Sequence, residues 1–167
     1  MPIEYTDIPR TADERTTLLD FLEWQRATLA RKCEGLSADQ LRRRSAPPAT
    51  LSLLGLVRHL ADVERGWFRR TLALEDAPDV FSSEADPDAD LNNVDVADVG
   101  EAFAAWRDEC ERARRIVATR TLDDTGRQRT GRLVSLRWIL IHMIEEYSRH
   151  NGHADLLRQA IDGATGY

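Results

Sequence analysis

Apolar side chains recur at helical spacing along the C-terminal part of the chain, from Ser135 to Gly163. They are Leu136, Ile139, Met143, Tyr147, Ala154, Leu157 and Ile161. Side chains three and four residues apart lie on the same face of an α-helix, whereas the faces of a strand alternate. The pattern therefore predicts a long amphipathic helix that starts at Ser135 and stops at Gly163, a typical residue after a helix end.

Three earlier segments show the same periodicity and predict long helices over about 11–35, 52–74 and 96–120. Thr11–Glu14 has the sequence of a capping box, which predicts the start of the first helix. Ser52 is a suitable N-cap for the second, because its hydroxyl can accept a hydrogen bond from a free N–H group at the helix start.

The connections between these helices differ in composition. A short turn of helix is expected after Ser37 and ends before Pro47 and Pro48. Asp, Ala, Pro, Ser and Asn dominate residues 75–98, and the Asp86–Asp90 segment is too acidic to build a core. We interpret this long acidic loop as a lid or a floppy insertion, and residues 121–134 as an irregular crossing.

Four long amphipathic helices, few strand signals and one long connection predict an all-α fold. The expected architecture is a four-helix bundle with the acidic loop between its second and third helices, in a single domain over residues 1–167. Metal and cofactor sites of such bundles are built in the core, from inward-facing side chains of different helices.

Charge and hydropathy exclude several classes of function. The formal net charge is −6, and no basic cluster is interleaved with aromatic residues, which argues against nucleic-acid binding. No apolar run approaches about 18 residues, so no membrane-spanning helix is expected. The N-terminal sequence MPIEYTD lacks the basic and apolar regions of a secretory signal. Cys33 and Cys110 lack the spacing of a zinc or redox motif, so we expect two buried thiols in a cytoplasmic protein.

Two ionisable residues, Glu146 and His150, interrupt the apolar face of the last helix. They are four residues apart, so a carboxylate and an imidazole leave the same face about 5–6 Å apart at the Cβ level. Such groups are costly to bury unless a partner satisfies them. His59, beside the apolar stripe of the second helix, can add a third ligand. The three side chains predict an N₂O metal site with one open position; zinc suits it best, and nickel, iron or manganese also accept such ligands.

Each of these residues also has a simpler interpretation. Glu146 and His150 could be only an ion pair along one helix. His153 could donate a hydrogen bond to a ligand or lie at the rim of the site. Glu64 could support a ligand histidine or pair with an arginine. Trp67 is most simply a core aromatic, although a tryptophan beside a bundle pocket often lines it.

A di-iron carboxylate site requires Glu-x-x-His on each of two helices. No Glu-x-x-His occurs anywhere in this chain, so that class of site is excluded. The sequence by itself assigns no catalytic residue.

Two segments carry a resemblance to a known family: SLLGLVRHLADVERGWF at 52–68 and HMIEEYSRHNGHADLL at 142–157. Together with GLSADQL at 35–41, they resemble the DinB-like superfamily, and more narrowly a little-characterised, actinobacterial-type branch of it. The resemblance covers nearly the whole chain. It implies a four-helix bundle in up-down-down-up order that is commonly dimeric.

The resemblance also implies a ligand set. Members of this superfamily hold a metal with one histidine of the second helix and two residues four apart on the fourth helix. The first of these two is a glutamate in the mycothiol-dependent maleylpyruvate isomerase type. The matching positions are His59, Glu146 and His150. Characterised relatives resemble thiol transferases that use mycothiol or bacillithiol, and Arg58, Arg137 and Arg149 are candidates for holding the sugar part of such a thiol, or are simply solvated.

Two functional hypotheses follow. The first is a divalent-metal-dependent thiol transferase or isomerase that uses a mycothiol-like thiol on small electrophiles, in detoxification or stress response. The second is a non-catalytic bundle that binds a metal or another ligand. In both, we expect a homodimer without nucleic-acid or membrane partners.

Overall fold

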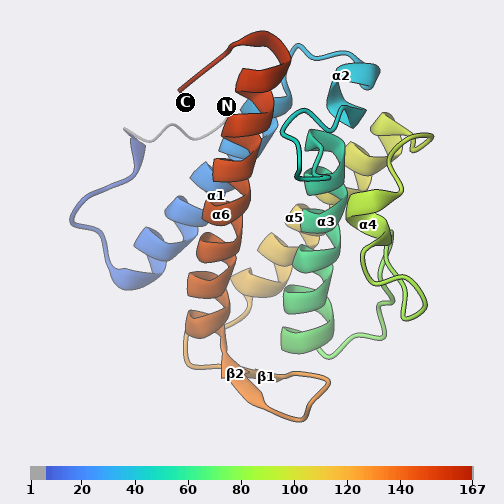
Figure 1. The fold of residues 1–167 in the computed structure, drawn as a ribbon. Coiled ribbons are helices and arrows are strands. Elements are labelled where there is room, and N and C mark those ends of the chain that lie inside the picture. The colour runs from blue at the N-terminus through green and yellow to red at the C-terminus, as the bar shows by residue number, and fades with distance from the viewer. Residues whose placement is uncertain (1–6, 167) are drawn as a thin grey trace.

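The computed structural model describes residues 7–166, which form a mainly helical protein (Figure 1). The elements are α1 (Glu14–Cys33), α2 (Ala38–Arg42), α3 (Leu53–Glu64), the π-helix η2 (Arg65–Leu72), α4 (Ala89–Asn92), α5 (Val99–Ala118), β1 (Thr125–Arg127), β2 (Leu133–Ser135) and α6 (Leu136–Asp162). The four long helices predicted from periodicity are confirmed. The first six residues, judged above for a secretory signal, lie outside the described residues.

The long helices pack in two pairs, α1 on α6 and α3 on α5 (Figure 1), and α3 also packs on α6. Their apolar faces form one cluster that includes the fully buried Leu29, Leu60 and Met143. Bundle packing of amphipathic helices is therefore confirmed. None of the described helices is long and apolar enough to cross a membrane.

Side-chain caps explain most helix starts. The Ser52 hydroxyl accepts a hydrogen bond from Gly55 N–H at 3.1 Å, as predicted. The prediction of a capping box at Thr11 is wrong, because α1 begins two residues later than expected. Asp13 caps it instead, and its carboxylate accepts from Thr16 N–H at 3.1 Å and from the Thr16 hydroxyl at 2.7 Å. A carboxylate at the helix start is also favoured by the helix dipole.

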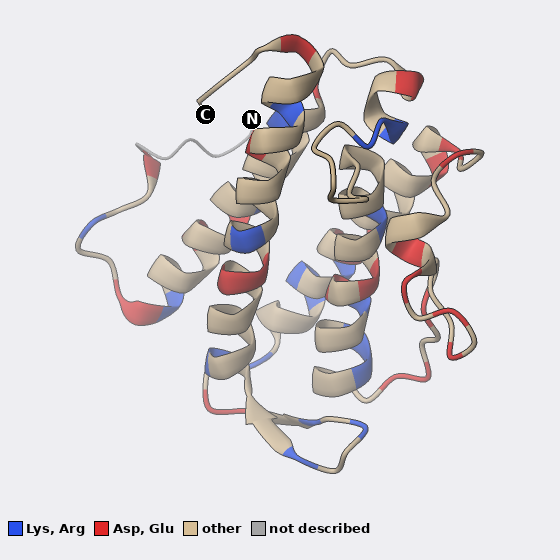
Figure 2. Cartoon of the chain, viewed as in Figure 1, with Lys and Arg blue, Asp and Glu red and all other residues tan. Residues whose placement is uncertain are grey.

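The acidic connection between η2 and α5 is part of the folded core, although its surface is strongly acidic (Figure 2). Asp62 of α3 accepts hydrogen bonds from the backbone N–H groups of Val80 and Phe81 at 2.6 and 3.1 Å. Further along, Ala89 and Asp90 of α4 are buried. The expectation that Asp86–Asp90 stays outside the core is wrong, because tertiary hydrogen bonds satisfy polar groups that no local pattern could pair.

One residue of each long helix joins a buried polar network in the bundle centre. Arg26 of α1 donates to both carboxylate oxygens of Glu64 of α3, at 2.7 and 2.6 Å. The Tyr147 hydroxyl of α6 donates to Glu64 at 2.8 Å and accepts from the Trp106 indole N–H of α5 at 2.8 Å. Burial raises the pKa of the Tyr147 hydroxyl far above its usual range, so the hydroxyl keeps its proton.

The segment expected as an irregular crossing contains a small hairpin. β1 and β2 pair antiparallel, with Gly126 opposite Val134. Each strand has only three residues, which is too short for an alternating pattern to be recognised in the sequence. The hairpin lies against η2, and a Cβ atom at Gly126 would lie only 2.1 Å from the Thr71 carbonyl oxygen. Only glycine fits this close approach.

Gly126→Ala is therefore expected to destabilise the protein by more than about 2 kcal/mol, because backbone atoms of η2 would have to move. Urea denaturation followed by circular dichroism measures this loss. Gly152→Ala is the matched control, since no atom lies within 4 Å of its added Cβ. In the interior of α6 this change should stabilise the protein by about 0.5–1 kcal/mol. Equal stability of Gly126→Ala and wild type would contradict the contact.

Candidate metal centre

Three predicted ligands from two helices meet beside the α3–α6 contact. His59 Nε2 of α3 lies 3.4 Å from Glu146 Oε1 of α6, and His150 Nε2 lies 3.4 Å from the same oxygen. One ligand atom of each residue lies within 4.8 Å of those of the other two. His150 is buried and the other two are partly buried. The two helices thus bring side chains that are 87 residues apart in sequence to one point.

The donor set fits a tetrahedral metal ion. Ligand atoms that lie about 2.0–2.1 Å from zinc at tetrahedral angles are about 3.3–3.4 Å from one another. The imidazole nitrogens of His59 and His150 each lie 3.4 Å from the Glu146 carboxylate oxygen, and these two separations match that spacing. Two imidazoles and one carboxylate leave a fourth position for water or a substrate atom, as in catalytic zinc sites.

Asp90 contacts a candidate ligand, and sequence reasoning did not single it out. Its Oδ2 lies 2.8 Å from Nδ1 of His59, and Asp90 is only 4 % exposed. A carboxylate on Nδ1 fixes the proton there and turns Nε2 towards the site, which also makes the imidazole a stronger donor. Arg58 holds α4 in place by donating to the carbonyls of Ala89 and Asn93, at 3.1 and 2.7 Å. The sequence signal was weak, because Asp90 is one of many acidic residues in its connection.

Hydrogen bonds shift the pKa values of two of the three candidate ligands, His59 and Glu146. Burial alone would lower the pKa of His59, but hydrogen bonds to Asp90 and Glu146 outweigh it and raise this pKa to about 9. Hydrogen bonds from His150 and His59 hold the pKa of Glu146 far below its usual range. The carboxylate is therefore ionised at neutral pH, and a metal ion that binds here displaces the proton from His59 Nε2.

The other predicted site residues have different surroundings. His153 Nδ1 lies 3.4 Å from Nδ1 of His150, where it can orient that ring. Burial lowers the pKa of His153, as do the nearby charges of His150 and Arg149. Glu64 belongs to the core network and pairs with Arg26, the simpler of its two interpretations. Arg149 pairs with Glu145 on the exposed side of α6 and does not reach the site.

The other two arginines considered for a sugar-type cofactor also bind groups outside the candidate ligand set. Arg58 lies over the Phe81 ring, 4.6 Å from its centroid, as well as holding α4. Arg137 pairs with Glu14 and Asp123 near the start of α6. The structure therefore places none of the three predicted arginines beside the candidate ligands.

A groove of about 480 Å³ lies between η2 and the β1–β2 hairpin. Of the three candidate ligands, His59 lines this groove, together with Asp90 and Trp67. Arg127 and Thr130, which sequence reasoning did not single out, line the opposite side. Most residues that line the groove are polar or charged, and Val63 and Trp67 add apolar surface.

The sequence of the chain matches the mycothiol-S-transferase family model over residues 17–163. The chain belongs to the mycothiol-S-transferase family. The match extends from α1 to the end of α6, so it includes all three candidate ligands, Asp90 and both sides of the groove. The DinB-like resemblance is thereby confirmed, in a narrower form. Among curated proteins, none matches the chain.

Asp90→Asn should weaken zinc binding to this mycothiol-S-transferase family member by about 10–100-fold, because His59 loses the charge that orients it. Zinc titration against a competing chelator measures the change. Asp88→Asn is the control, since the exposed Asp88 is in the same connection and its side chain makes no cap hydrogen bond. Identical zinc affinities of the two variants would show that Asp90 does not support the site.

Proposed function

We propose that this mycothiol-S-transferase family member binds one divalent metal through His59, Glu146 and His150 and joins mycothiol to small electrophiles. The observation that carries this proposal is the convergence of three donor atoms within 4.8 Å of one another, one of which, on His59, belongs to a residue that lines a groove. Zinc is the favoured metal because the ligands are nitrogen and oxygen with an open position. Removal of reactive electrophiles, as in detoxification or stress response, is the physiological role that fits this chemistry.

A divalent metal at this site would lower the pKa of the mycothiol thiol and favour its nucleophilic thiolate form. The transferase reaction forms a bond between the thiol sulfur and an electrophilic carbon, and it releases the leaving group and the thiol proton. Asp90 keeps the His59 proton on Nδ1, so that Nε2 stays directed at the site. Glu146 adds negative charge next to the two imidazoles, which favours a cation between them.

The groove walls provide the polar contacts that a sugar-containing thiol needs. Arg127 comes from the end of β1, Thr130 comes from the hairpin loop, and Thr71 comes from η2. We propose that these side chains bind the polar part of mycothiol and that Trp67 packs against one face of the bound molecules. Hydrogen-bond donors and one aromatic surface are suited to sugar rings, which combine hydroxyl groups with apolar C–H faces.

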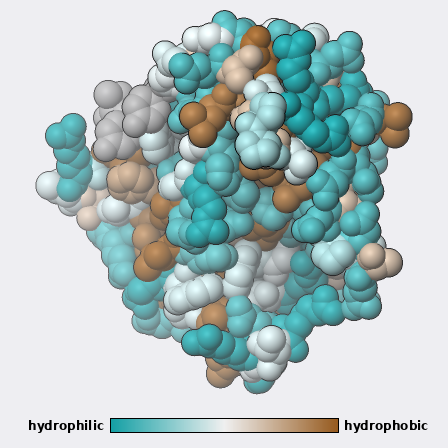
Figure 3. Space-filling model, viewed as in Figure 1, coloured by the Kyte–Doolittle hydropathy of each residue, from teal (hydrophilic) through white to brown (hydrophobic). Residues whose placement is uncertain are grey.

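We further propose one domain in up-down-down-up order that works in the cytoplasm as a homodimer. Cys33 and Cys110 are both free and buried, which fits a reducing compartment. The face in Figure 3 is mainly hydrophilic, with small separate hydrophobic areas. Trp138, Ile141 and Leu156 of α6 are exposed and supply apolar surface for a second copy.

Metal analysis by mass spectrometry tests the site directly, on protein purified without added metal or a histidine tag. We expect about one metal ion per chain in wild type and none in His150→Ala, because two remaining ligands bind a metal weakly. His142→Ala is the matched control, since His142 lies about two turns before His150 in α6 and stacks on Trp138 with 5.0 Å between ring centroids. Equal metal content in all three proteins would rule out the proposed ligands.

A thiol titration of the cobalt-substituted protein tests the reaction. We expect mycothiol to produce a new sulfur-to-metal absorption band, because its thiolate would take the open position. S-methylated mycothiol is the control, since it cannot form a thiolate and should leave the spectrum unchanged. A cobalt spectrum that does not respond to mycothiol would favour the non-catalytic metal-binding alternative over the transferase.

A further inference from the structure

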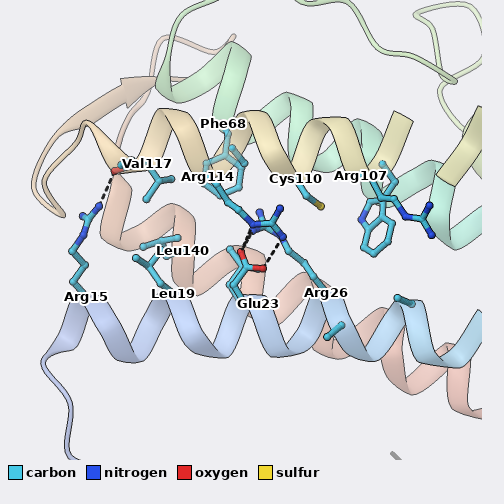
Figure 4. Close-up of a pocket in the computed structure, with 16 residues that line it drawn as sticks. Arg15, Leu19, Glu23, Arg26, Phe68, Arg107, Cys110, Arg114, Val117 and Leu140 are labelled. Carbon is cyan, nitrogen blue, oxygen red and sulfur yellow. Dashed lines mark hydrogen bonds and ion pairs between the residues drawn. The ribbon is translucent and has the colours of Figure 1, made fainter. Parts of the chain in front are cut away.

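A cavity of about 710 Å³ lies between α1 and α5, away from the candidate metal ligands. This volume is in the range of small-molecule pockets. Apolar side chains form most of its wall: Leu19, Leu22, Phe68, Val117 and Leu140. Figure 4 shows α1 and α5 on opposite sides of this space, with side chains of both helices directed into it.

Small residues and arginine bridges explain why the cavity stays open. The facing positions of the two helices include Ala27, Ala30 and Ala113, which are too short to fill the space between them. At one end, Arg15 of α1 donates to the carbonyl oxygens of Val117 and Arg120 at 2.7 and 2.9 Å. The long arginine side chain can connect α1 and α5 across a separation that is too wide for facing alanine side chains to touch.

A second bridge crosses the middle of the cavity (Figure 4). Arg114 of α5 donates to both carboxylate oxygens of Glu23 of α1, at 3.0 and 2.7 Å. Glu23 also accepts from Arg26 at 2.6 Å. The bridge thus separates the end of the cavity near Arg15 from the end near Arg107.

The charges around the cavity are opposite in sign to those of the whole chain. The chain has a formal net charge of −6, yet the charged lining residues are Arg15, Arg26, Arg107, Arg114 and Glu23. Of the carboxylates that pair with these arginines, Glu64 binds Arg26 and Glu111 binds Arg114. Four guanidinium groups therefore face three carboxylates, and Arg15 donates only to the carbonyl oxygens of Val117 and Arg120.

A second arginine of the cavity lining, Arg107, lies at the opposite end of the cavity from Arg15 (Figure 4). Arg107 lies over the Phe103 ring, 5.5 Å from its centroid, and among the described residues no carboxylate pairs with it. The Trp106 N–H is already bonded to Tyr147, so its ring presents an apolar surface to the cavity. One exposed cation next to an apolar wall is complementary to a molecule with a single anionic group and an apolar body.

We propose that the α1–α5 cavity is a second ligand site, which binds an amphipathic monocarboxylate. Its carboxylate pairs with Arg107, and its apolar body lies along Trp106, Ala30 and Ala27. This site is independent of the metal centre, so it stands whether or not the protein is a metal-dependent transferase.

Calorimetric titration of the full chain with decanoate, and with decanol as its uncharged match, tests the site. We expect saturable binding of one decanoate per chain and about tenfold weaker binding to Arg107→Gln, which lacks the charge-assisted contact. Decanol affinity should be the same for both proteins. Arg112→Gln is the matched control, because Arg112 is an exposed arginine of α5 that pairs with Asp108 and does not line the cavity.

Ala30→Phe tests the location of the apolar body, since the larger ring fills the Arg107 end of the cavity. A folded Ala30→Phe protein should lose decanoate binding. Three results would overturn the proposal: no decanoate binding to wild type, equal weakening in Arg107→Gln and Arg112→Gln, or unchanged binding to a folded Ala30→Phe protein. A wild-type dimer that Ala30→Phe converts to monomers, in sedimentation without ligand, would identify a second copy as the occupant and also overturn it.

Discussion

The buried pairing of Arg26 with Glu64 connects the rest of the structure, because it lies where all four long helices meet. Glu64 is fully buried and Arg26 is 4 % exposed, so neither charge can be hydrated. Such a pair adds little net stability compared with apolar side chains, but the loss of one partner costs about 3–5 kcal/mol. Tyr147 and Trp106 extend the network to α6 and α5. Its geometry therefore determines how the helices are positioned along one another.

The candidate metal centre depends on that alignment. Glu146 directly precedes Tyr147 in α6, and His59 lies little more than one turn before Glu64 in α3. A shift of one helix along the other by a single residue would separate these donor atoms, since each residue rises by about 1.5 Å and rotates by about 100°. The relative positions of α3 and α6, which the core network determines, therefore also place the candidate ligands. Asp90, in the connection between η2 and α5, then orients His59.

Arg26 also links the network to the α1–α5 cavity, because it pairs with Glu23 as well as Glu64. The bundle therefore encloses two different environments. One is a groove near two imidazoles and a carboxylate, suited to a cation and a polar thiol. The other is an apolar cavity with excess positive charge, suited to an amphipathic anion. Close packing of the helices alone would leave neither the groove nor the cavity. The polar bridges that hold α1 and α5 apart keep the α1–α5 cavity open.

The sequence by itself indicated the four long helices and the candidate metal ligands, since helical periodicity and residue spacing depend on local physics. Helical periodicity and caps such as Ser52 identified the long helices, and the spacing of Glu146 and His150 placed two ligands on one face. Asp90 on His59, the pairing of Glu64 with Arg26, the hairpin against η2 and the α1–α5 cavity were decided only by tertiary structure. These features join residues far apart in the chain, and no local pattern records which distant partners meet once the helices pack.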